Sequence, residues 1–172
     1  MQASTRLLFG TALAACALVG VALATPKHGL NFFNVLASGT INSEVLDHVH
    51  VALPAAGPER EDGWAAKVVT TGPSNFLVQD VSFLPGGATG WHSHPGILLS
   101  TVTEGSIEWY DVNCQKHVYN VGDSLTETTA VHYVRNAGTV NARFLVTYII
   151  AKDQPWRIDQ PAPACAAPLG LN

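Results

Sequence analysis

Between Trp64 and Ala151 the chain alternates short apolar stretches with turn residues, at intervals of about ten residues. This spacing is typical of an all-β sandwich or barrel, and beyond the N-terminal segment no window longer than about ten residues shows helical periodicity. Two pairs of strands are expected to join as hairpins, one across Glu104-Gly105 and one across residues 136–139. The predicted strands are 67–71, 76–84, 90–94, 97–103, 106–112, 115–120, 123–128, 131–135 and 142–151.

The rest of the chain divides around this regular region. Residues 40–45 and 48–53 are weaker strand candidates, and the tail from Pro155 is rich in proline and alanine. We therefore predict a single domain, with a signal peptide at 1–24, N-terminal strands and a linker at 25–63, the barrel at 64–151 and an irregular C-terminal tail at 152–172.

The N-terminal segment has the features of a secretory signal peptide. Arg6 precedes an apolar run at 7–23, which ends in the small-x-small sequence Ala-Leu-Ala at 22–24. We therefore predict a secreted or periplasmic protein. Two alternatives remain open: the sequence Leu-Ala-Ala-Cys at 13–16 is similar to a lipobox, whose Cys16 would carry a lipid, and the run is just long enough to remain as an uncleaved anchor.

Composition narrows the function classes. Hydrophobic residues make up 47% of the chain and charged residues 13%, so we expect a packed core rather than disorder. The formal net charge is −4 and no run of Lys or Arg occurs, which excludes the clustered cations that nucleic-acid binding needs. Once the signal peptide is removed, no segment is expected to span a membrane.

Three cysteines are present, and Cys16 leaves with the predicted signal peptide. The remaining pair, Cys114 and Cys165, is expected to form a disulfide in an oxidising compartment. Such a bond would close a loop of about fifty residues and contribute about 4 kcal/mol in the chain-entropy model. Two free thiols are the alternative.

Three histidines are the candidate metal ligands: His92, His94 and His132. Side chains alternate along a strand, so His92 and His94 point to the same face, about 7 Å apart. His132 lies on another predicted strand near the end of the regular region. Imidazoles from two elements commonly share one metal ion, so this spacing predicts a metal site.

Glycines at fixed distances frame the first two histidines. The pattern G-x5-H-x-H-x3-E-x6-G is matched without a gap by Gly86, His92, His94 and Gly105, with Leu98 at the position of the Glu. The histidine spacing alone is weak evidence, whereas the whole frame is far more specific.

A second motif follows in the same order along the chain. The pattern G-x5-P-x-G-x2-H-x3-N is matched in part: His132 and Asn136 have its spacing, Glu127 and Thr129 stand at the positions of Pro and Gly, and Gly122 lies one residue closer to Glu127 than the pattern requires. Asn136 is expected to cap the following turn through side-chain hydrogen bonds.

With both motifs in order, residues 64–151 resemble the cupin superfamily, and within it the secreted single-domain bacterial cupins. The resemblance implies an all-β double-stranded β-helix, the cupin jelly-roll barrel, in which the three histidines converge on one divalent metal ion. Zn, Mn, Fe, Cu and Ni are all candidates for that ion. Because Leu98 replaces the motif Glu, the implied ligand set is three imidazoles without the usual carboxylate.

Two carboxylates and a second histidine pair are further candidate ligands, for the same metal ion or for a second one. Glu127 is the better outside candidate because it lies near His132, but we expect it to be a solvated turn residue, and Glu104 an exposed one. A second His-x-His pair, His48 and His50, lacks the glycine frame and is expected to form the polar edge of a strand.

The resemblance leaves three classes of function open. The first is a metal-dependent enzyme, most sharply a dioxygenase-type enzyme; the catalytic residues and the substrate remain to be identified. The second is a non-catalytic protein that binds a small molecule or the metal itself, and the third is a barrel with a vestigial site. A cupin fold does not by itself select among these chemistries. A homodimer is also compatible with the resemblance.

Overall fold

Twelve strands and one short 3₁₀ turn make up the part of the chain that the computed structural model describes, residues 24–51 and 64–171. The side chains of 47–51 and 64–66 lie outside the described part, as do the predicted signal peptide and Cys16. Within the described ranges no helix is long and apolar enough to cross a membrane. The strands are β1 (His28–Ile41), β2 (Val45–Val51), β3 (Trp64–Thr70), β4 (Ser74–Ala88), β5 (His92–Ser93), β6 (Gly96–Glu104), β7 (Ser106–Asp111), β8 (Lys116–Asn120), β9 (Ser124–Glu127), β10 (His132–Arg135), β11 (Ala142–Ala151) and β12 (Ile158–Asp159).

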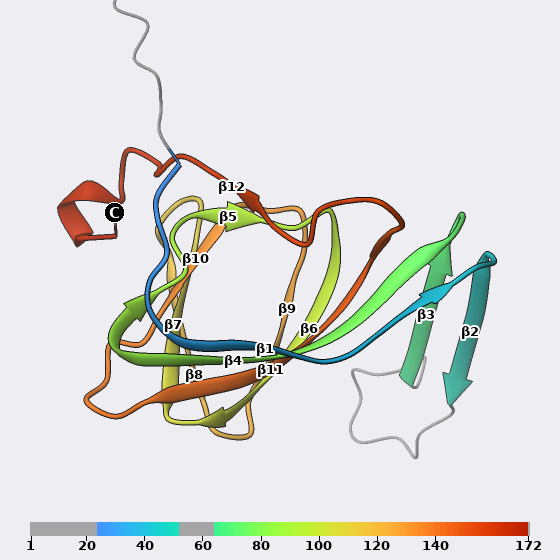
Figure 1. Cartoon of the computed structure of the whole chain (residues 1–172), viewed down its shortest axis with the longest axis horizontal. Helices are drawn as coiled ribbons and strands as arrows, with labels where there is room; N and C mark the ends of the chain where they lie inside the picture. The colour runs from blue at the N-terminus through green and yellow to red at the C-terminus, as the bar shows by residue number, and fades with distance from the viewer. Residues whose placement is uncertain (1–23, 52–63, 172) are drawn as a thin grey trace, which may run out of the picture.

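Ten of these strands form one sheet that bends until it nearly closes into a barrel (Figure 1). One face holds β1, β4, β11, β6 and β9 in that order, and the other holds β12, β5, β10, β7 and β8. The two faces meet where Arg135 of β10 pairs with Ala88 of β4. This double-stranded β-helix confirms the predicted all-β fold class. β2 and β3 form a separate hairpin that stands to one side of the barrel in Figure 1.

Inward-facing side chains form rows that run across neighbouring strands. Because side chains alternate along a strand, Tyr148 of β11, Leu98 of β6 and Glu127 of β9 lie in register in one row, and all three are buried. The neighbouring rows are mainly apolar, and burial of each large side chain in them stabilises the fold by about 1.5–3 kcal/mol. Their members include Val81, Phe83, Val102, Leu125, Val134, Phe144 and Val146, whereas Leu77 lies beside Tyr148 and extends the first row.

The predicted hairpin across Glu104-Gly105 is wrong. β6 pairs with β11 and β9, and β7 pairs with β10 and β8, so this turn carries the chain from one face of the barrel to the other. Gly105 has a φ of 66°, and a Cβ at this position would lie 2.5 Å from the carbonyl oxygen of Asn141. The turn therefore depends on glycine. A short turn fits a crossing between faces as well as a hairpin, so spacing alone does not reveal the partner strand.

The pairing predicted across residues 136–139 is also wrong, because this connection likewise carries the chain from one face of the barrel to the other. β10 pairs with β4, β5 and β7, whereas β11 pairs with β4 and β6. Asn136 fixes the connection, which confirms its predicted role as a turn cap. Its side-chain oxygen accepts a hydrogen bond from the Gly138 N–H at 2.9 Å, and its amide donates to the carbonyl oxygens of Val140 and Phe83.

The N-terminal strands differ most from the prediction. β1 runs antiparallel to β4 over fourteen residues, whereas the predicted strand 40–45 overlaps only its last two and is interrupted at 42–44. Most of β1 is exposed, and its apolar residues do not alternate, so the sequence lacks the period that marks a strand. β1 and β12 pair with barrel strands although they lie outside 64–151. The domain boundaries stay predictions.

Candidate metal centre

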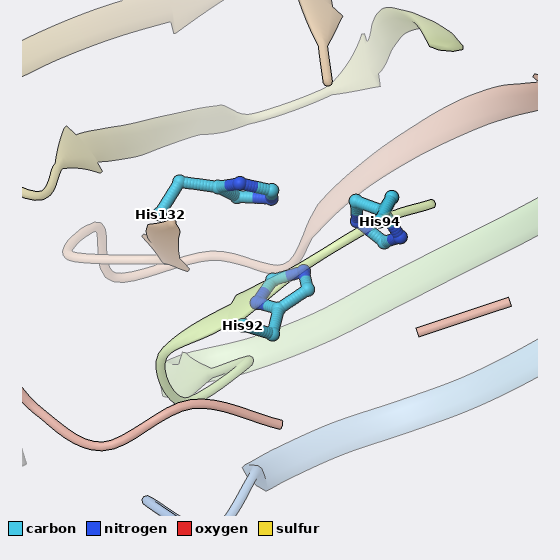
Figure 2. Close-up of side chains that lie close together, drawn as sticks. All are labelled: His92, His94 and His132. Atoms are coloured by element: carbon cyan, nitrogen blue, oxygen red, sulfur yellow. The ribbon is translucent and has the colours of Figure 1, made fainter. Parts of the chain in front are cut away.

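Three imidazoles from two strands converge inside the barrel (Figure 2). His92 begins β5, His94 follows just after it, and His132 begins β10, where its backbone pairs with that of His92. The ring centroids lie 4.2 to 5.2 Å apart, and each residue is at most 4% exposed. The available ligand atoms all lie within 4.8 Å of one another. The structure thus brings together all three histidines that the sequence singled out.

Backbone carbonyl groups determine the tautomer of each ring. A carbonyl oxygen only accepts hydrogen bonds, so a ring nitrogen beside it carries the proton and leaves the lone pair on the other nitrogen. Metal-binding imidazoles are commonly held in this way. The pairs, each from an Nδ1 donor to a carbonyl oxygen, are His92 to Gly90 at 2.9 Å, His94 to Trp156 at 2.7 Å and His132 to Ala130 at 2.9 Å.

The opposite ring nitrogens are buried without a partner. Within the described residues, Nε2 of His94 and Nε2 of His132 have no hydrogen bond. An unsatisfied buried polar atom costs about 1–3 kcal/mol, and native proteins rarely leave two of them side by side. A cation placed between these lone pairs would satisfy both.

Burial keeps two of these imidazoles neutral. It is the largest cause that lowers the pKa of His92 well below its usual range, with His132 and Arg157 acting in the same direction. Burial also lowers the pKa of His94, although Glu127 opposes it. A neutral imidazole keeps the lone pair that a metal ion binds.

The turn before His92 depends on Gly90. This residue has a φ of 70°, and a Cβ there would lie 2.4 Å from the carbonyl oxygen of Thr25. Thr25 also accepts a hydrogen bond from the Trp91 N–H through its hydroxyl oxygen, at 2.5 Å. The segment before β1 therefore packs against the turn whose carbonyl group orients His92.

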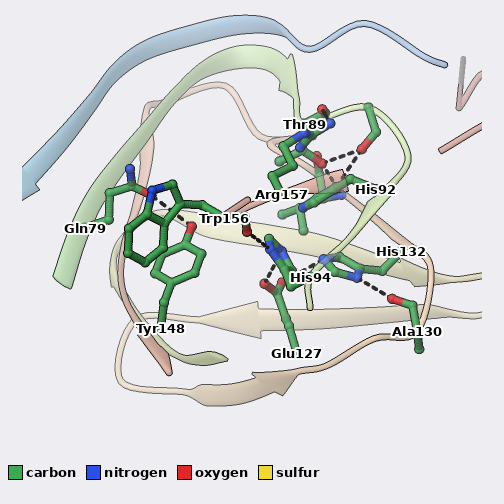
Figure 3. A network of polar contacts seen from close by, with 12 residues as sticks. Gln79, Thr89, His92, His94, Glu127, Ala130, His132, Tyr148, Trp156 and Arg157 are labelled. Carbon is green, nitrogen blue, oxygen red and sulfur yellow. Dashed lines mark hydrogen bonds and ion pairs between the residues drawn. The ribbon is translucent and has the colours of Figure 1, made fainter. Parts of the chain in front are cut away.

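Glu127 is buried in the site, so the prediction of a solvated turn residue is wrong. It ends β9, is 6% exposed, and shares its inward face with Leu125 two residues earlier. Its carboxylate oxygens lie 3.7 Å from Nε2 of His94 and 3.6 Å from Nε2 of His132 (Figure 3). The alternation that includes Leu125 is the signal in the sequence that indicates an inward-facing Glu127.

Leu98 occupies the motif position where a carboxylate is expected. It is fully buried, and it lies directly opposite Glu127 in the β6–β9 pair. Burial raises the pKa of Glu127, but positive charge at His132 and His94 outweighs burial, and the net effect lowers the pKa below its usual value. A metal ion held by the neutral imidazoles would supply that positive charge. An ionised carboxylate therefore stands one strand away from the position that Leu98 fills.

The groups of this cluster present acceptor atoms to one another. Neutral Nε2 atoms and carboxylate oxygens repel, and separations of 3.6 and 3.7 Å are longer than hydrogen bonds. Two ligand atoms that bind the same metal ion at about 2.1 Å lie roughly 3.0 to 4.2 Å apart. The chemistry of these residues and the distances from Glu127 therefore fit a divalent metal ion with nitrogen and oxygen ligands, and the histidine ligand atoms, up to 4.8 Å apart, would draw closer together around it.

A cavity of about 160 Å³ opens beside the cluster. His92, His94 and Glu127 form part of its wall, so a metal ion held by them would face the cavity. The remaining wall is largely apolar with two cationic side chains: Lys27, Phe33, Val81, Thr89, Val134, Phe144, Tyr148, Trp156 and Arg157.

The C-terminal segment contributes one side of the site. β12 pairs with β5, which places Asp159 opposite His92, and Trp156 supplies the carbonyl group that orients His94. A disulfide between Cys114 and Cys165 ties this segment to the β7–β8 connection, in agreement with the predicted pair.

The other sequence candidates do not join the cluster. Glu104 is exposed at the end of β6, as expected. His48 and His50 lie in β2, in the part whose side chains are outside the described residues. Trp156 and Arg157 are not predicted from the sequence, because a tail rich in proline and alanine gives no periodic signal.

Comparison with known families agrees with the fold. Residues 79–148 match the family model Cupin_2, described as a cupin domain, and this segment contains all three histidines and Glu127. The chain therefore contains a cupin domain.

Several solved structures are similar to part of this chain at low sequence identity. A conserved protein with a double-stranded β-helix domain from Klebsiella pneumoniae is 23% identical, covering 49% of this chain and 73% of that chain with a TM-score of 0.43. A cupin-like protein from Thermotoga maritima is 26% identical, covering 51% and 65% with a TM-score of 0.43. A predicted oxalate decarboxylase from the same organism is 20% identical, covering 46% and 83% with a TM-score of 0.40. No curated protein matches the sequence.

Proposed function

We propose that the protein binds one divalent metal ion through Nε2 of His92, His94 and His132, with Glu127 as a fourth ligand. The observation that carries this proposal is a set of three buried imidazoles whose Nδ1 protons are held by backbone carbonyl groups. Imidazole and carboxylate ligands suit Zn, Mn, Fe, Cu and Ni, and experiment has to choose among them. A bound divalent ion would supply Lewis acidity toward a ligand in the adjoining cavity.

Metal content per chain tests this proposal. The protein is stripped with a chelator, dialysed against each of the five metals in turn, and measured by elemental analysis. We expect about one equivalent for at least one metal, and close to none for the His92→Ala/His132→Ala variant. His117→Ala, an exposed histidine on β8, is the matched control. Less than about a tenth of an equivalent for every metal would indicate a vestigial site.

We propose further that the cavity holds a small molecule next to the metal ion. A dioxygenase-type reaction is the catalytic form of this proposal, and capture without chemistry is the non-catalytic form. Oxygen uptake by the metal-loaded protein, with small phenols, thiols and diketones as substrates, separates the two. Uptake that disappears in His92→Ala supports an enzyme, whereas ligand binding without uptake supports a binding protein.

The disulfide supports the proposal that the chain is exported. Its presence is compatible with an extracellular or periplasmic location, because such bonds persist in oxidising compartments. Mass spectrometry of protein expressed with its own N-terminus tests the predicted processing. A chain that starts at Thr25 supports cleavage after residue 24, a lipid on Cys16 supports a lipoprotein, and an intact N-terminus supports an uncleaved anchor.

A further inference from the structure

The cavity beside the histidine cluster combines apolar walls with two cationic side chains, and we infer that it binds a small organic carboxylate with a short apolar body. The inference rests on the proposed metal site and adds to it the chemical class of the ligand. Three features carry it: fixed cations, hydroxyl groups already engaged within the protein, and the size of the cavity.

Arg157 provides the first cation, from the C-terminal segment. Its Nη2 donates to the carbonyl oxygen of Thr89 at 2.7 Å (Figure 3). Its Nε donates to a carboxylate oxygen of Asp159 at 2.5 Å. These contacts fix the planar guanidinium at the cavity wall while leaving it 21% exposed. The carboxylate of Asp159 is 58% exposed, so water screens its charge. A fixed guanidinium suits the flat carboxylate group of a ligand.

Lys27 provides the second cation, from the segment before β1. Its Nζ lies 5.6 Å from the centre of the Phe33 ring, within the range of a cation–π contact, and both residues line the cavity. Among the described residues of this wall, Glu127 is the one acidic side chain, and the proposed site uses it as a metal ligand. The loaded cavity therefore has a positive formal charge and favours an anion.

The hydroxyl groups of the wall are engaged within the protein. The Tyr148 hydroxyl donates to the side-chain oxygen of Gln79 at 2.8 Å. The Thr89 hydroxyl donates to the carbonyl oxygen of Gly90 at 2.9 Å and accepts from the Val134 N–H. Among the described residues that line the cavity, the cations are thus the main donors left for a ligand. A carboxylate satisfies them better than a neutral amide or alcohol of the same shape.

The apolar wall limits the rest of the ligand. Phe33, Val81, Val134, Phe144 and Trp156 surround a volume of about 160 Å³. An engineered cavity of about 150 Å³ in another protein accepts benzene, so a body of about six carbon atoms fits here, and nucleotides or sugar chains do not.

Calorimetric titration of carboxylates against their neutral amides tests the inference. Benzoate is compared with benzamide, and pentanoate with pentanamide, on both metal-free and zinc-loaded protein. We expect the zinc-loaded protein to bind a carboxylate at least about tenfold more tightly than its amide, and Arg157→Gln to remove that preference. Lys152→Gln, an exposed cation outside this cavity, should retain the preference.

Each outcome decides one of the two proposals. Equal affinity for carboxylate and amide, or no carboxylate binding by protein that holds its zinc, overturns the inference and leaves the metal site intact. Failure to take up any metal overturns the proposed function, and the titrations on metal-free protein then decide the ligand class separately. Should Arg157→Gln fail to fold, Lys27→Gln, which removes the other cation of the wall, replaces it, with an expected loss of about threefold in carboxylate affinity.

Discussion

Leu98 and Glu127 lie directly opposite each other across β6 and β9, and both side chains face the barrel interior. Cross-strand neighbours have Cβ atoms roughly 4.5–5.5 Å apart, a distance that one glutamate side chain spans. Leu98 on β6 supplies no carboxylate to the histidine cluster, and Glu127 on β9 can therefore supply one from the neighbouring strand. The motif carboxylate is absent at position 98, and Glu127 provides a carboxylate at the position directly across from it.

Replacing Glu127 by Gln should weaken metal binding by about ten- to a hundredfold, because the variant keeps the shape of the side chain and removes its charge. Competition titration with a chromophoric chelator measures the change. Glu104→Gln, an exposed carboxylate on β6, is the matched control and should bind as the unaltered protein does. A Glu127→Gln variant with unchanged affinity would show that three histidines alone hold the ion.

The two positions should also be exchangeable. In the Leu98→Glu/Glu127→Leu variant the carboxylate returns to β6 and the leucine moves to β9, so the buried volume of the pair is preserved. We expect this variant to bind metal more tightly than Glu127→Leu alone, in the same competition assay. Equal affinities for the two variants would contradict the cross-strand interpretation.

Metal removal should lower the melting temperature. An ion at a hundred times its dissociation constant stabilises the folded state by about 2.7 kcal/mol, which corresponds to about 5–10 °C in a chain of this size. Scanning calorimetry with and without a chelator measures this shift. The His92→Ala/His132→Ala variant should melt at one temperature under both conditions, and an unaltered protein that behaves in this way would argue against a resident ion.

Loss of the disulfide should destabilise both the fold and the site. The bond between Cys114 and Cys165 closes a sequence separation of 51 residues, so Cys114→Ser/Cys165→Ser should reduce the free energy of unfolding by about 2–4 kcal/mol. Metal should also dissociate faster, because Trp156 in the same segment orients His94. Urea unfolding and a chelator-exchange time course measure the two effects. Reductant should lower the free energy of unfolding and speed metal dissociation in the unaltered protein, and it should change neither quantity in the variant.

Glu108 should make stability sensitive to acid. Burial raises its pKa, but hydrogen bonds from Tyr110, Arg135 and Lys116 outweigh burial and lower the pKa from 4.5 to about 2. The unfolded chain therefore takes up this proton at a higher pH than the folded protein does. The stabilisation is complete above about pH 5 and is lost as the pH falls toward 2. Glu108→Gln should cost about 1–3 kcal/mol at pH 7 and progressively less toward pH 2, measured by urea unfolding.

Local patterns in the sequence are sufficient for the strand positions between residues 64 and 151 and for the three histidines. Both follow from short-range regularities: alternation along one strand, glycines at turns, and two motifs of fixed spacing. His92 and His94 share a face because of that alternation, and the motif frame selects His132 from the other histidines. The structure brings all three together.

Strand partners and the fourth carboxylate depend on information that local patterns lack. The turn at Gly105 has the length of a hairpin and crosses between faces, because the partners of β6 and β7 come from distant parts of the chain. Glu127 was misjudged because the motif predicts a turn there, whereas its environment is set by Leu98 on a neighbouring strand. Arg157 gives no local signal, since its place depends on the pairing of β12 with β5.

The position of Trp156 near the end of the chain sets an order of assembly. The histidines and Glu127 are synthesised before it, yet the Nδ1 of His94 gains its carbonyl partner only when residue 156 has left the ribosome. β12 and Cys165 follow later still, so the wall of the site closes last. The barrel can thus bring its ligand residues together before residue 156 is present, whereas a fully oriented centre requires the segment that follows β11.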